Sequence, residues 1–347
     1  MIVHFIKCED YQAVEKKLLP VLEGYSSLFS PGEKVLVKPN LLSARKPEEA
    51  VATHPKVVEV VLRFLKDLGI FPYVGDSPAY GSLQKVLQVS GIWEVCQKLS
   101  VPAVELNEPV EVDGQRYKKI RISSKVFDFD KVVNVAKLKT HSQMVLTLAV
   151  KNLFGCVPGI EKSGWHIRCE TNENFAALLV DICLIVNPVL SIVDGVEGME
   201  GNGPANGKKK KFGVIVVSSN PFALDHAICL RLNVDPFLVY TVRESIARGL
   251  VKDYSIDGDW SSSIELPVTV PSLPVKGPLR QIARMIVRVP KISKKECIRC
   301  KICEEKCPAK AIDLSRSDID YKKCIRCYVC HEVCPRGAIE LVRRIFI

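Results

Sequence analysis

The sequence contains no apolar run long enough to cross a membrane. Its longest hydrophobic stretch, residues 175–193, is interrupted by Asp181 and by Asn187 and Pro188, whereas a membrane-spanning helix needs about 20 apolar residues. The N-terminal residues also lack the basic segment and apolar core of an export signal. We therefore expect a cytoplasmic protein with no membrane span, in a reducing compartment that keeps its thiols free.

Nucleotide and nucleic-acid motifs are missing as well. No Gly-x-Gly-x-x-Gly follows the first predicted strand, and the glycines of residues 194–207 are not followed by the Gly-Lys-Ser/Thr of a P-loop. The formal net charge is +10, yet the only basic run is Lys208 to Lys211. Neither a helix-turn-helix pattern nor an aromatic platform accompanies it. We therefore predict no nucleic-acid partner, and we interpret the run as a solvated loop or an anion site.

What the sequence does have is cysteine: eight of its fourteen cysteines lie in two copies of one pattern. Each copy has three cysteines spaced Cys-x2-Cys-x2-Cys, a fourth after three more residues, and then proline; the copies occupy residues 297–308 and 324–335. Four thiolates are what a 4Fe-4S cluster requires, although paired Cys-x2-Cys units can also build zinc sites. Zinc sites rarely need this whole pattern twice, so the spacing favours two iron-sulfur clusters.

The duplicated run resembles that of bacterial two-cluster ferredoxins, in which the last cysteine of each copy crosses to the other cluster. This resemblance implies one 4Fe-4S cluster held by Cys297, Cys300, Cys303 and Cys334. It implies a second 4Fe-4S cluster held by Cys324, Cys327, Cys330 and Cys307. It also implies a small C-terminal α+β domain at residues 291–347, which would exchange electrons with a redox partner protein.

Strand and helix patterns alternate in the part of the chain before residue 266. Short, mostly apolar runs typical of buried parallel strands occur at residues 34–38, 71–74, 131–136 and 189–193. Amphipathic segments typical of helices lie between several of them. This alternation predicts an α/β domain over residues 1–265, with a mostly parallel sheet and helices on both faces.

Residues 266–290 differ in composition from the parts that flank them. An extended linker is predicted by four prolines, at positions 267, 271, 274 and 278. Beyond them, Arg280, Arg284 and Arg288 recur at every fourth residue with apolar residues between, which predicts an amphipathic basic helix. We interpret this helix as a connection between the domains; contact with a membrane surface is the alternative.

Polar side chains gather just after the ends of the predicted strands. Because ligands of open α/β sheets bind outside the carboxyl ends of the strands, we expect these residues to share one crevice. The candidates for binding a cofactor or substrate there are Lys38, Asn40, His54, Asp76, Asn152, Asp194 and Glu197. Lysine and histidine could also protonate a reduced product, so the candidates for catalysis are Lys139, His141 and Lys151.

Each of these candidates has a structural alternative. Lysines beside strand ends are usually solvated, and the glycine-rich residues 194–207 can form a flexible surface loop. The acids of that segment, Asp194, Glu197 and Glu200, could instead hold a divalent cation such as Mg²⁺. The sequence therefore leaves open an additional, unidentified small molecule or divalent metal in the α/β domain.

Several short motifs resemble the family called domain of unknown function 362 (DUF362). They cover roughly residues 1–240 and include Val-Lys-Pro-Asn at 37–40, Thr-His-Pro at 53–55, Gly-Asp-Ser-Pro at 75–78, Ala-Lys-Leu-Lys-Thr-His at 136–141, Val-Lys-Asn-Leu-Phe-Gly at 150–155 and the glycine-rich segment at 193–204. Members of that family often carry a two-cluster ferredoxin module at the C-terminus, as this chain does. The resemblance supports the location of the site and implies no particular reaction.

Together these patterns predict an iron-sulfur electron-transfer protein of the ferredoxin-type oxidoreductase class. Electrons would pass from the clusters to an unknown small-molecule substrate or cofactor in the crevice. The alternative is a non-enzymatic protein, which would transfer electrons, sense redox state or deliver a cluster or metal. In that case the α/β domain would dock a partner.

Overall fold

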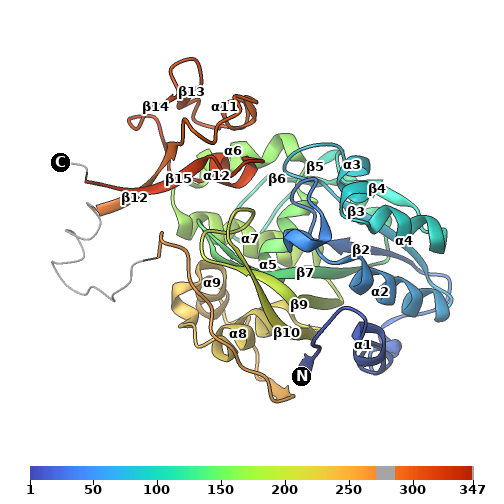
Figure 1. Cartoon of the computed structure of the whole chain (residues 1–347). Coiled ribbons are helices and arrows are strands. Elements are labelled where there is room, and N and C mark those ends of the chain that lie inside the picture. Colours follow the sequence, from blue (N-terminus) through green and yellow to red (C-terminus); the bar gives the residue numbers. More distant parts are fainter. Residues whose placement is uncertain (271–285, 346–347) are drawn as a thin grey trace.

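The structure, a computed structural model, describes residues 1–270 and 286–345 (Figure 1). Within these residues, the larger domain is built on one nine-stranded sheet. From edge to edge its strands are β11 (Ser255–Asp257), β1 (Ile2–Lys7), β10 (Lys208–Ser218), β9 (Leu190–Glu200), β7 (Lys131–His141), β2 (Lys34–Pro39), β3 (Phe71–Asp76) and β4 (Ala103–Glu105). The remaining strand, β8 (Val145–Thr147), pairs with the end of β7.

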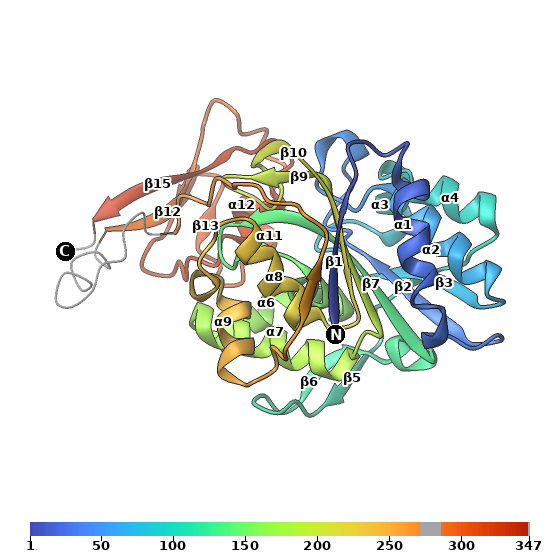
Figure 2. The ribbon, with the colours of Figure 1, turned by 90° about the horizontal axis from the view of Figure 1, so that it is seen from below.

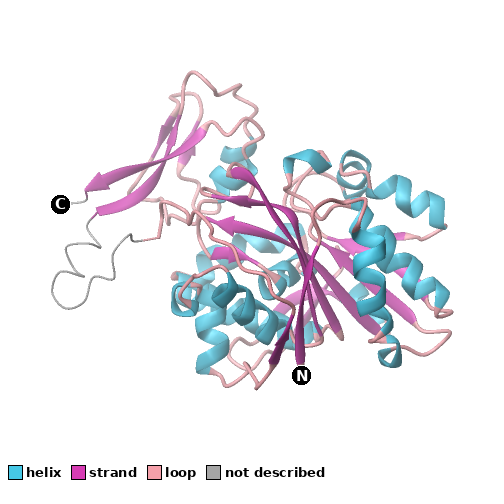
Figure 3. Ribbon diagram, turned by 60° about the horizontal axis from the view of Figure 1, so that its bottom comes forward, coloured by secondary structure: helices cyan, strands magenta, loops and turns pink. Residues whose placement is uncertain are grey.

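Most neighbouring strands of this sheet are parallel, as predicted. Parallel pairs join β1 to β11, β2 to β3 and β7, β3 to β4, and β7 to β9. The exceptions are β10, which is antiparallel to β1 and β9, and the short β8, which is antiparallel to β7. Figure 3 shows the strands in magenta and the helices in cyan. A separate hairpin consists of β5 (Pro109–Val112) and β6 (Ile120–Ser123). The parallel strands β2, β3 and β7 present their carboxyl ends at one edge of the sheet.

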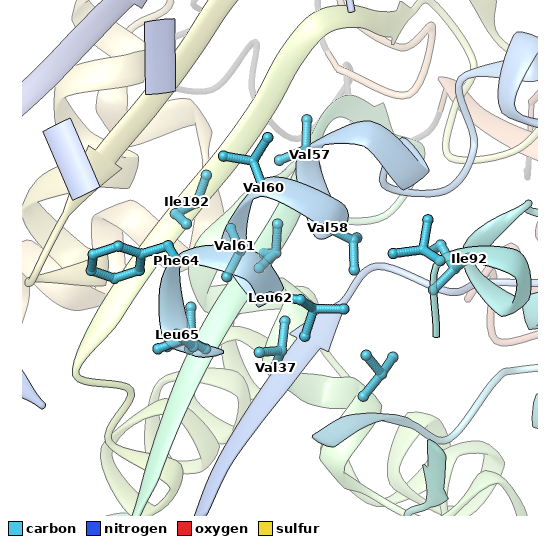
Figure 4. Close-up of a cluster of buried hydrophobic side chains, with 14 of the residues drawn as sticks. Val37, Val57, Val58, Val60, Val61, Leu62, Phe64, Leu65, Ile92 and Ile192 are labelled. Atoms are coloured by element: carbon cyan, nitrogen blue, oxygen red, sulfur yellow. The ribbon is translucent and has the colours of Figure 1, made fainter. Parts of the chain in front are cut away.

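Helices cover both faces of the sheet, which confirms the predicted layering (Figure 2). One face carries α1 (Val14–Glu23), α2 (Pro55–Asp67), α3 (Leu83–Val89) and α4 (Ile92–Leu99). The other face carries α5 (Ala149–Asn152), α6 (Gly159–Cys169), α7 (Asn172–Val186), α8 (Pro221–Arg231) and α9 (Tyr240–Ala247). Strand side chains alternate between the faces: Val37 packs in the cluster of α2, as Figure 4 shows, whereas Leu36 packs with α7.

The C-terminal domain is small and built around its own core. Strands β12 (Ile286–Ile292) and β15 (Ile339–Ile345) form an antiparallel pair. Between them lie helix α11 (Ile302–Glu305), strands β13 (Ile312–Asp313) and β14 (Asp318–Ile319), and helix α12 (Val329–Val333). Its buried side chains include cysteines of both repeats. Across the described residues of both domains, no helix is long and apolar enough to cross a membrane.

The predicted basic helix is wrong over residues 286–290. These residues belong to β12, whose backbone pairs with β15 from Ile286 opposite Ile345 to Ile292 opposite Ile339. A four-residue spacing of arginines fits one face of a helix, but it also fits one face of a strand, where side chains repeat every second residue. The C-terminal domain therefore begins by Ile286 and not at residue 291. The rest of the predicted helix, and most of the predicted linker, lie outside the described residues.

The lysine run is neither a loop nor an anion site, because it opens strand β10. Each of its four lysines forms an ion pair of 3.0–3.1 Å: Lys208 with Glu265, Lys209 with Glu197, Lys210 with Glu200 and Lys211 with Glu9. Two of these carboxylates belong to β9, which continues past its predicted end to Glu200. Opposite charges on neighbouring antiparallel strands attract one another, so the run stabilises the sheet.

Candidate functional site: a cavity between the two domains

A cavity of about 310 Å³ lies where the strand ends of the α/β domain meet the C-terminal domain. Its volume is at the lower end of the range for small-molecule sites. Seven of the ten predicted site residues line it, namely Lys38, Asn40, Asp76, Lys139, His141, Lys151 and Asn152. The C-terminal domain contributes Glu305, Lys306, Val329, Glu332 and Val333. The predicted crevice at the strand ends is thus closed on one side by the helices that carry cysteines.

A buried ion pair between Lys38 and Asp76 lies at the wall of the cavity. The Nζ of Lys38 lies 3.0 Å from the Oδ2 of Asp76, which also accepts a hydrogen bond from the backbone N–H of Leu41. Gly155 packs directly against this pair, because a Cβ there would lie 2.2 Å from Asp76 Oδ1 and 2.4 Å from Lys38 Nζ. The charges of Lys38 and Asp76 therefore neutralise each other. Only glycine fits at position 155, because any side chain there would clash with the pair.

A chain of three asparagines fixes the orientation of Asn40. Asn134 Nδ2 donates to the carbonyl of Ala149 at 2.9 Å, so its Oδ1 is free to accept from Asn152 Nδ2 at 2.8 Å. Asn152 Oδ1 in turn accepts from Asn40 Nδ2 at 2.8 Å. The Oδ1 of Asn40 is left without a hydrogen-bond partner in the described part of the chain. The cavity thus has a hydrogen-bond acceptor whose direction is set by its neighbours.

His141 presents a hydrogen-bond donor to the same space. Its Nδ1 accepts hydrogen bonds from the backbone N–H groups of Gln143 and Met144, at 3.1 and 3.3 Å, so the ring proton is on Nε2. Burial lowers the pKa of His141 well below its usual range, and Lys151 and Lys139 lower it further. The ring is therefore neutral. Its Nε2 has no hydrogen-bond partner among the described residues and lies 3.6 Å from the carboxylate of Glu332, too far for a hydrogen bond.

Three lysines near His141 have unusual environments. Burial lowers the pKa of Lys139 to about 7 and that of Lys162 to about 8, and it also lowers the pKa of Lys151. Lys139 Nζ donates a hydrogen bond to the backbone carbonyl of Val51 at 2.6 Å, and Lys162 Nζ donates one to the backbone carbonyl of Ser77. Lys151 Nζ lies 5.3 Å from the centre of the Phe154 ring and forms no hydrogen bond or ion pair with the described residues.

Buried polar atoms without a partner are concentrated at this cavity. Of the eight such side-chain atoms in the described residues, four belong to cavity residues: Asn40 Oδ1, His141 Nε2, Thr147 Oγ1 and His166 Nδ1. A buried polar group without a hydrogen bond costs roughly 1–3 kcal/mol. Their convergence indicates a site that a polar ligand completes.

Sequence reasoning did not single out Lys162, His166 or Glu332. Lys162 and His166 are four residues apart on α6, and that helical spacing could have indicated that they share a face. Glu332 lies between Cys330 and Cys334, and its position in the cavity depends on how the two domains pack. No local pattern signals such packing.

His54, Asp194 and Glu197 do not line the cavity. The buried carboxylate of Asp194 binds Lys137 Nζ at 2.8 Å, the hydroxyl of Tyr11 at 3.2 Å and the backbone N–H of His54 at 3.0 Å. The ring of His54 stacks on Tyr11 with ring centres 3.4 Å apart, and its Nδ1 caps the start of α2. These contacts form a separate polar cluster that is satisfied internally.

The acids of the glycine-rich segment are paired with lysines and do not point at a common centre. Asp194 binds Lys137, and Glu197 and Glu200 bind lysines of β10. In the part of the chain that the structure describes, no three His, Cys, Asp or Glu side chains gather as ligands of a single metal ion. The arrangement of these carboxylates therefore does not support the Mg²⁺ alternative.

The two cysteine repeats have the same local structure. Left-handed backbone conformations recur at equivalent positions, Arg299 and Arg326, Lys301 and Tyr328, and Lys310 and Gly337. The fourth cysteine of each repeat accepts a backbone N–H···S hydrogen bond, from Ala311 to Cys307 at 3.3 Å and from Ala338 to Cys334 at 3.2 Å. Hydrogen bonds to cluster sulfurs tune reduction potentials.

The effects of the cysteine thiols on one another's pKa indicate two sets of four. Burial raises the pKa of the Cys303 thiol to about 11, and its neighbours Cys334, Cys300 and Cys297 raise it further. Burial also raises the pKa of Cys330 well above its usual range, and there the thiols of Cys327, Cys324, Cys307 and, with the smallest effect, Cys303 raise it further. Apart from this last contribution, each set joins three cysteines of one repeat to the fourth of the other. The donor sets fit two 4Fe-4S clusters, and the crossed assignment of ligands stays a prediction consistent with this grouping.

Helix α12 is joined to the glycine-rich segment by hydrogen bonds around His331. The two ring nitrogens of His331 lie 2.7 Å from the carbonyl oxygen of Ile339 and 3.0 Å from that of Asn202. Asn206 Nδ2 donates to the backbone carbonyl of His331 at 2.6 Å. The segment after β9 therefore positions the C-terminal domain, and its glycines allow close packing: a Cβ at Gly203 would lie 2.2 Å from the carbonyl oxygen of Thr140.

This fold and these cysteines define an iron-sulfur protein in which an α/β domain is joined to a ferredoxin-like two-cluster domain. Residues 35–230 match the family model described as "Domain of unknown function (DUF362)", and residues 296–339 match the "4Fe-4S dicluster domain". The chain belongs to the DUF362 family, and its C-terminal domain holds two 4Fe-4S clusters.

The chain is also similar to one curated protein and, more weakly, to one solved structure. The chain is 36% identical over 255 residues to the thylakoid-associated protein sll1697 of Synechocystis sp. (strain ATCC 27184 / PCC 6803 / Kazusa), covering 72% of this chain and 79% of that protein. The lactate racemase apoprotein from Thermoanaerobacterium thermosaccharolyticum matches with 13% identity and a TM-score of 0.37, over 55% of this chain and 50% of that one.

Proposed function

We propose that the protein is an oxidoreductase that passes electrons from its two clusters to a small molecule bound in the cavity between the domains. One observation carries the proposal: a single cavity is lined both by the polar strand ends and by residues of α11 and α12. Those helices contain the cluster cysteines Cys303 and Cys330. A molecule in the cavity would therefore lie next to the electron source.

Two electrons delivered to a bound molecule require two protons if the product is to keep the charge of the substrate. The clusters supply the electrons, one at a time. Lys139 is suited to supply a proton, because burial lowers its pKa to about 7, near the operating pH of a general acid. Lys162, whose pKa is about 8, can supply another. The neutral His141 donates its Nε2–H to developing negative charge and keeps its proton.

Electrons would enter at the exposed edge of the first repeat. Cys300 is the exposed cysteine of that repeat, and the neighbouring side chain of Ile298 is 61% exposed. Four exposed cations lie within six residues of Cys300, namely Lys294, Lys295, Arg299 and Lys301, and the same stretch has one exposed acid, Glu296; none of the five forms an ion pair with the described residues. An exposed apolar side chain in a stretch with an excess of positive charge fits a redox partner protein with an acidic surface.

The reducing, cytoplasmic location predicted from the sequence is part of the same proposal. No disulfide joins any of the fourteen cysteines in the described residues: six are buried outside the repeats, and the other eight are the predicted cluster ligands. Free thiols persist in reducing compartments, and cluster cysteines must stay reduced to bind iron.

The test is substrate-linked reoxidation of the clusters. The holoprotein is purified anaerobically, reduced with dithionite and mixed with pools of small metabolites while the visible absorption of the clusters is followed. A competent substrate should restore the oxidised spectrum. Lys139→Met should slow that reaction about 100-fold, the usual scale of general acid catalysis, without changing the cluster spectrum. The matched control is Lys209→Met, because Lys209 is paired with Glu197 outside the cavity.

Two outcomes would contradict the proposal. If no small molecule reoxidises the clusters and none co-purifies with the holoprotein, the α/β domain docks a partner and the enzyme proposal is wrong. If Lys139→Met and Lys209→Met react alike with a competent substrate, the site has been assigned to the wrong residues.

A further inference from the structure

The positive charge of the cavity is only partly balanced by the protein. Lys38 is neutralised by Asp76. Lys139, Lys151 and Lys162 line the same cavity, and none forms an ion pair with a carboxylate in the described residues. A lysine that is buried without a counter-ion is unstable as a cation, and a bound anion removes that penalty.

One carboxylate does face these groups, and it comes from the other domain. Glu332 on α12 lies 3.6 Å from His141 Nε2, and its charge raises the pKa of both Lys139 and Lys151. It makes no hydrogen bond to any of them. Glu305 also lines the cavity, but it is exposed and its charge is matched by the neighbouring Lys306, so Glu332 leaves the three lysines with an excess of positive charge.

The polar atoms without partners specify more than a charge. The Nε2–H of His141, which is 3% exposed, and the hydroxyl of Thr147, also 3% exposed, can donate hydrogen bonds to a ligand oxygen. The Oδ1 of Asn40 can only accept, because the chain of asparagines fixes its orientation. A ligand that satisfies all three groups has acceptor oxygens and at least one N–H or O–H.

The size of the cavity sets a further limit. Its 310 Å³ lies at the lower end of the range for sites that hold small molecules. A ligand of metabolite size fits this space.

We propose that the cavity binds a small oxyanion, a carboxylate or a phosphate, that also carries an N–H or O–H donor. The oxyanion faces the lysines and His141, and the donor faces Asn40. This inference rests on the proposed function for the role of the ligand as substrate, but the binding itself requires no electron transfer.

The test is calorimetric titration of the oxidised holoprotein in low salt, with acetate, glycolate, inorganic phosphate and acetamide as probes. Acetate tests the carboxylate alone, and glycolate adds a hydroxyl. Phosphate tests the other oxyanion, and acetamide is the uncharged analogue.

We expect glycolate to bind more tightly than acetate by about tenfold, the effect of one additional hydrogen bond of about 1.4 kcal/mol. We expect acetamide not to bind. Tighter binding of phosphate than of both carboxylates would assign the site to phosphate compounds.

Two variants locate the binding. Lys151→Met should weaken the binding of the preferred anion by about tenfold or more, because it removes a charge that has no other partner. Lys209→Met, in which the lysine removed is already paired with Glu197, should bind the anion as the wild type does. Asn40→Leu should abolish the preference for glycolate over acetate. Unchanged cluster absorption shows that each variant is folded around its iron.

Acetamide binding as tightly as acetate would overturn the proposal. So would equal effects of Lys151→Met and Lys209→Met, or the absence of binding by every anionic probe up to about 50 mM, where even a Kd of a few mM is measurable. Failure here is distinguishable from failure of the proposed function. Anion binding without substrate-linked reoxidation disproves only the oxidoreductase, and reoxidation by an uncharged substrate disproves only the oxyanion site.

Discussion

The Nε2 of His141 lies 3.6 Å from the Oε2 of Glu332, which places a side chain of strand β7 opposite one from the helix that carries Cys330. The two residues are 191 positions apart in the sequence (332 minus 141). One belongs to the α/β domain and the other to the cluster domain. The two domains therefore meet at the cavity. A ligand there would lie between the lysines of the α/β domain and the helix that carries a cluster cysteine.

Glu332→Gln should tighten anion binding in the cavity. The substitution removes the negative charge opposite His141, so repulsion of a bound oxyanion falls, and we expect an increase in affinity of about threefold to tenfold. It also removes an interaction that raises the pKa of Lys139 and Lys151. Calorimetric titration with acetate over a series of pH values measures both effects. Glu305→Gln is the control, since Glu305 lines the cavity but is exposed. Weaker anion binding in Glu332→Gln would show that this carboxylate helps to hold the ligand.

Anion binding should decrease as the pH rises from about 6.5 to 8.5. Burial lowers the pKa of Lys139 to about 7 and that of Lys162 to about 8, so both ammonium groups lose their protons within this window. Glu332 and Asp76 act in the opposite direction on Lys139, and Lys151 and Lys137 act in the same direction as burial. The affinity for acetate, which is itself fully ionised throughout this range, reports the lysines alone. Affinity that stays constant to pH 9 would contradict the lowered pKa of Lys139.

Much of the α/β domain could be predicted from the sequence because its signals are local. Apolar runs bounded by Pro and Gly predict the strands, and the rule that ligands bind at the carboxyl ends of strands holds for any open α/β sheet. Seven predicted residues therefore meet at one cavity. Asp194 was assigned to a strand end, but β9 continues to Glu200, which puts Asp194 inside the strand and in contact with Lys137.

What could not be predicted depends on contacts between distant parts of the chain. Glu332 reaches the cavity because Asn202 and Asn206 contact His331, and residue patterns within either segment carry no information about the other. The same holds for the tautomer of His141, which is set by two backbone N–H groups in the turn that follows β7. The paired lysines of β10 have a similar cause, because their partners lie on other elements.

Lys139→Met should stabilise the α/β domain at acidic and neutral pH. Burial lowers the folded-state pKa of Lys139 to about 7 from its usual value near 10.5. Between these values the unfolded chain holds a proton that the folded chain has lost, so the stability of the wild type rises with pH across the window. Methionine removes this dependence and leaves the carbonyl of Val51 without its donor, which offsets part of the gain. We expect a net gain of about 1–3 kcal/mol at pH 6, below the roughly 5 kcal/mol that a lowering of the pKa from 10.5 to about 7 implies at about 1.36 kcal/mol per unit.

Anaerobic urea unfolding at pH 6 and pH 9 measures this effect. The difference between Lys139→Met and wild type should be larger at pH 6 than at pH 9. Lys209→Met serves as the control for loss of a lysine that is not buried. A stability difference that grows with pH would have the wrong sign and would rule out a folded-state pKa near neutrality.

Cys307→Ala should damage the cluster that is bound by Cys324, Cys327 and Cys330. The thiol of Cys307 is among those that raise the pKa of Cys330, whereas Cys334 is the thiol with the largest effect on the pKa of Cys303. Iron content should fall by about half, and electron paramagnetic resonance of the reduced protein should retain the signal of one cluster and lose the interaction between two.

Cys334→Ala should leave the cluster that is bound by Cys324, Cys327 and Cys330. Adding Cys324→Ala to each variant identifies the survivor: the double variant with Cys307→Ala should keep its remaining cluster, and the double variant with Cys334→Ala should lose it. The reverse pattern would refute crossed ligation.

Charge reversal at the exposed edge of the first repeat should slow reduction by an acidic electron carrier. Arg299 and Lys301 flank Cys300 and have no ion pair in the described residues, so Arg299→Glu with Lys301→Glu replaces attraction by repulsion. Electrostatic steering of this kind changes association rates by about 10- to 1,000-fold and weakens as salt is added. Stopped-flow reduction by an acidic ferredoxin should therefore be much slower for the variant than for the wild type at low salt, and the rates of the two proteins should converge at high salt.

Lys211→Glu, on the α/β domain, is the control. Equal rates at low salt for all three proteins would place the electron entry elsewhere, and the more buried second repeat would then have to accept electrons directly.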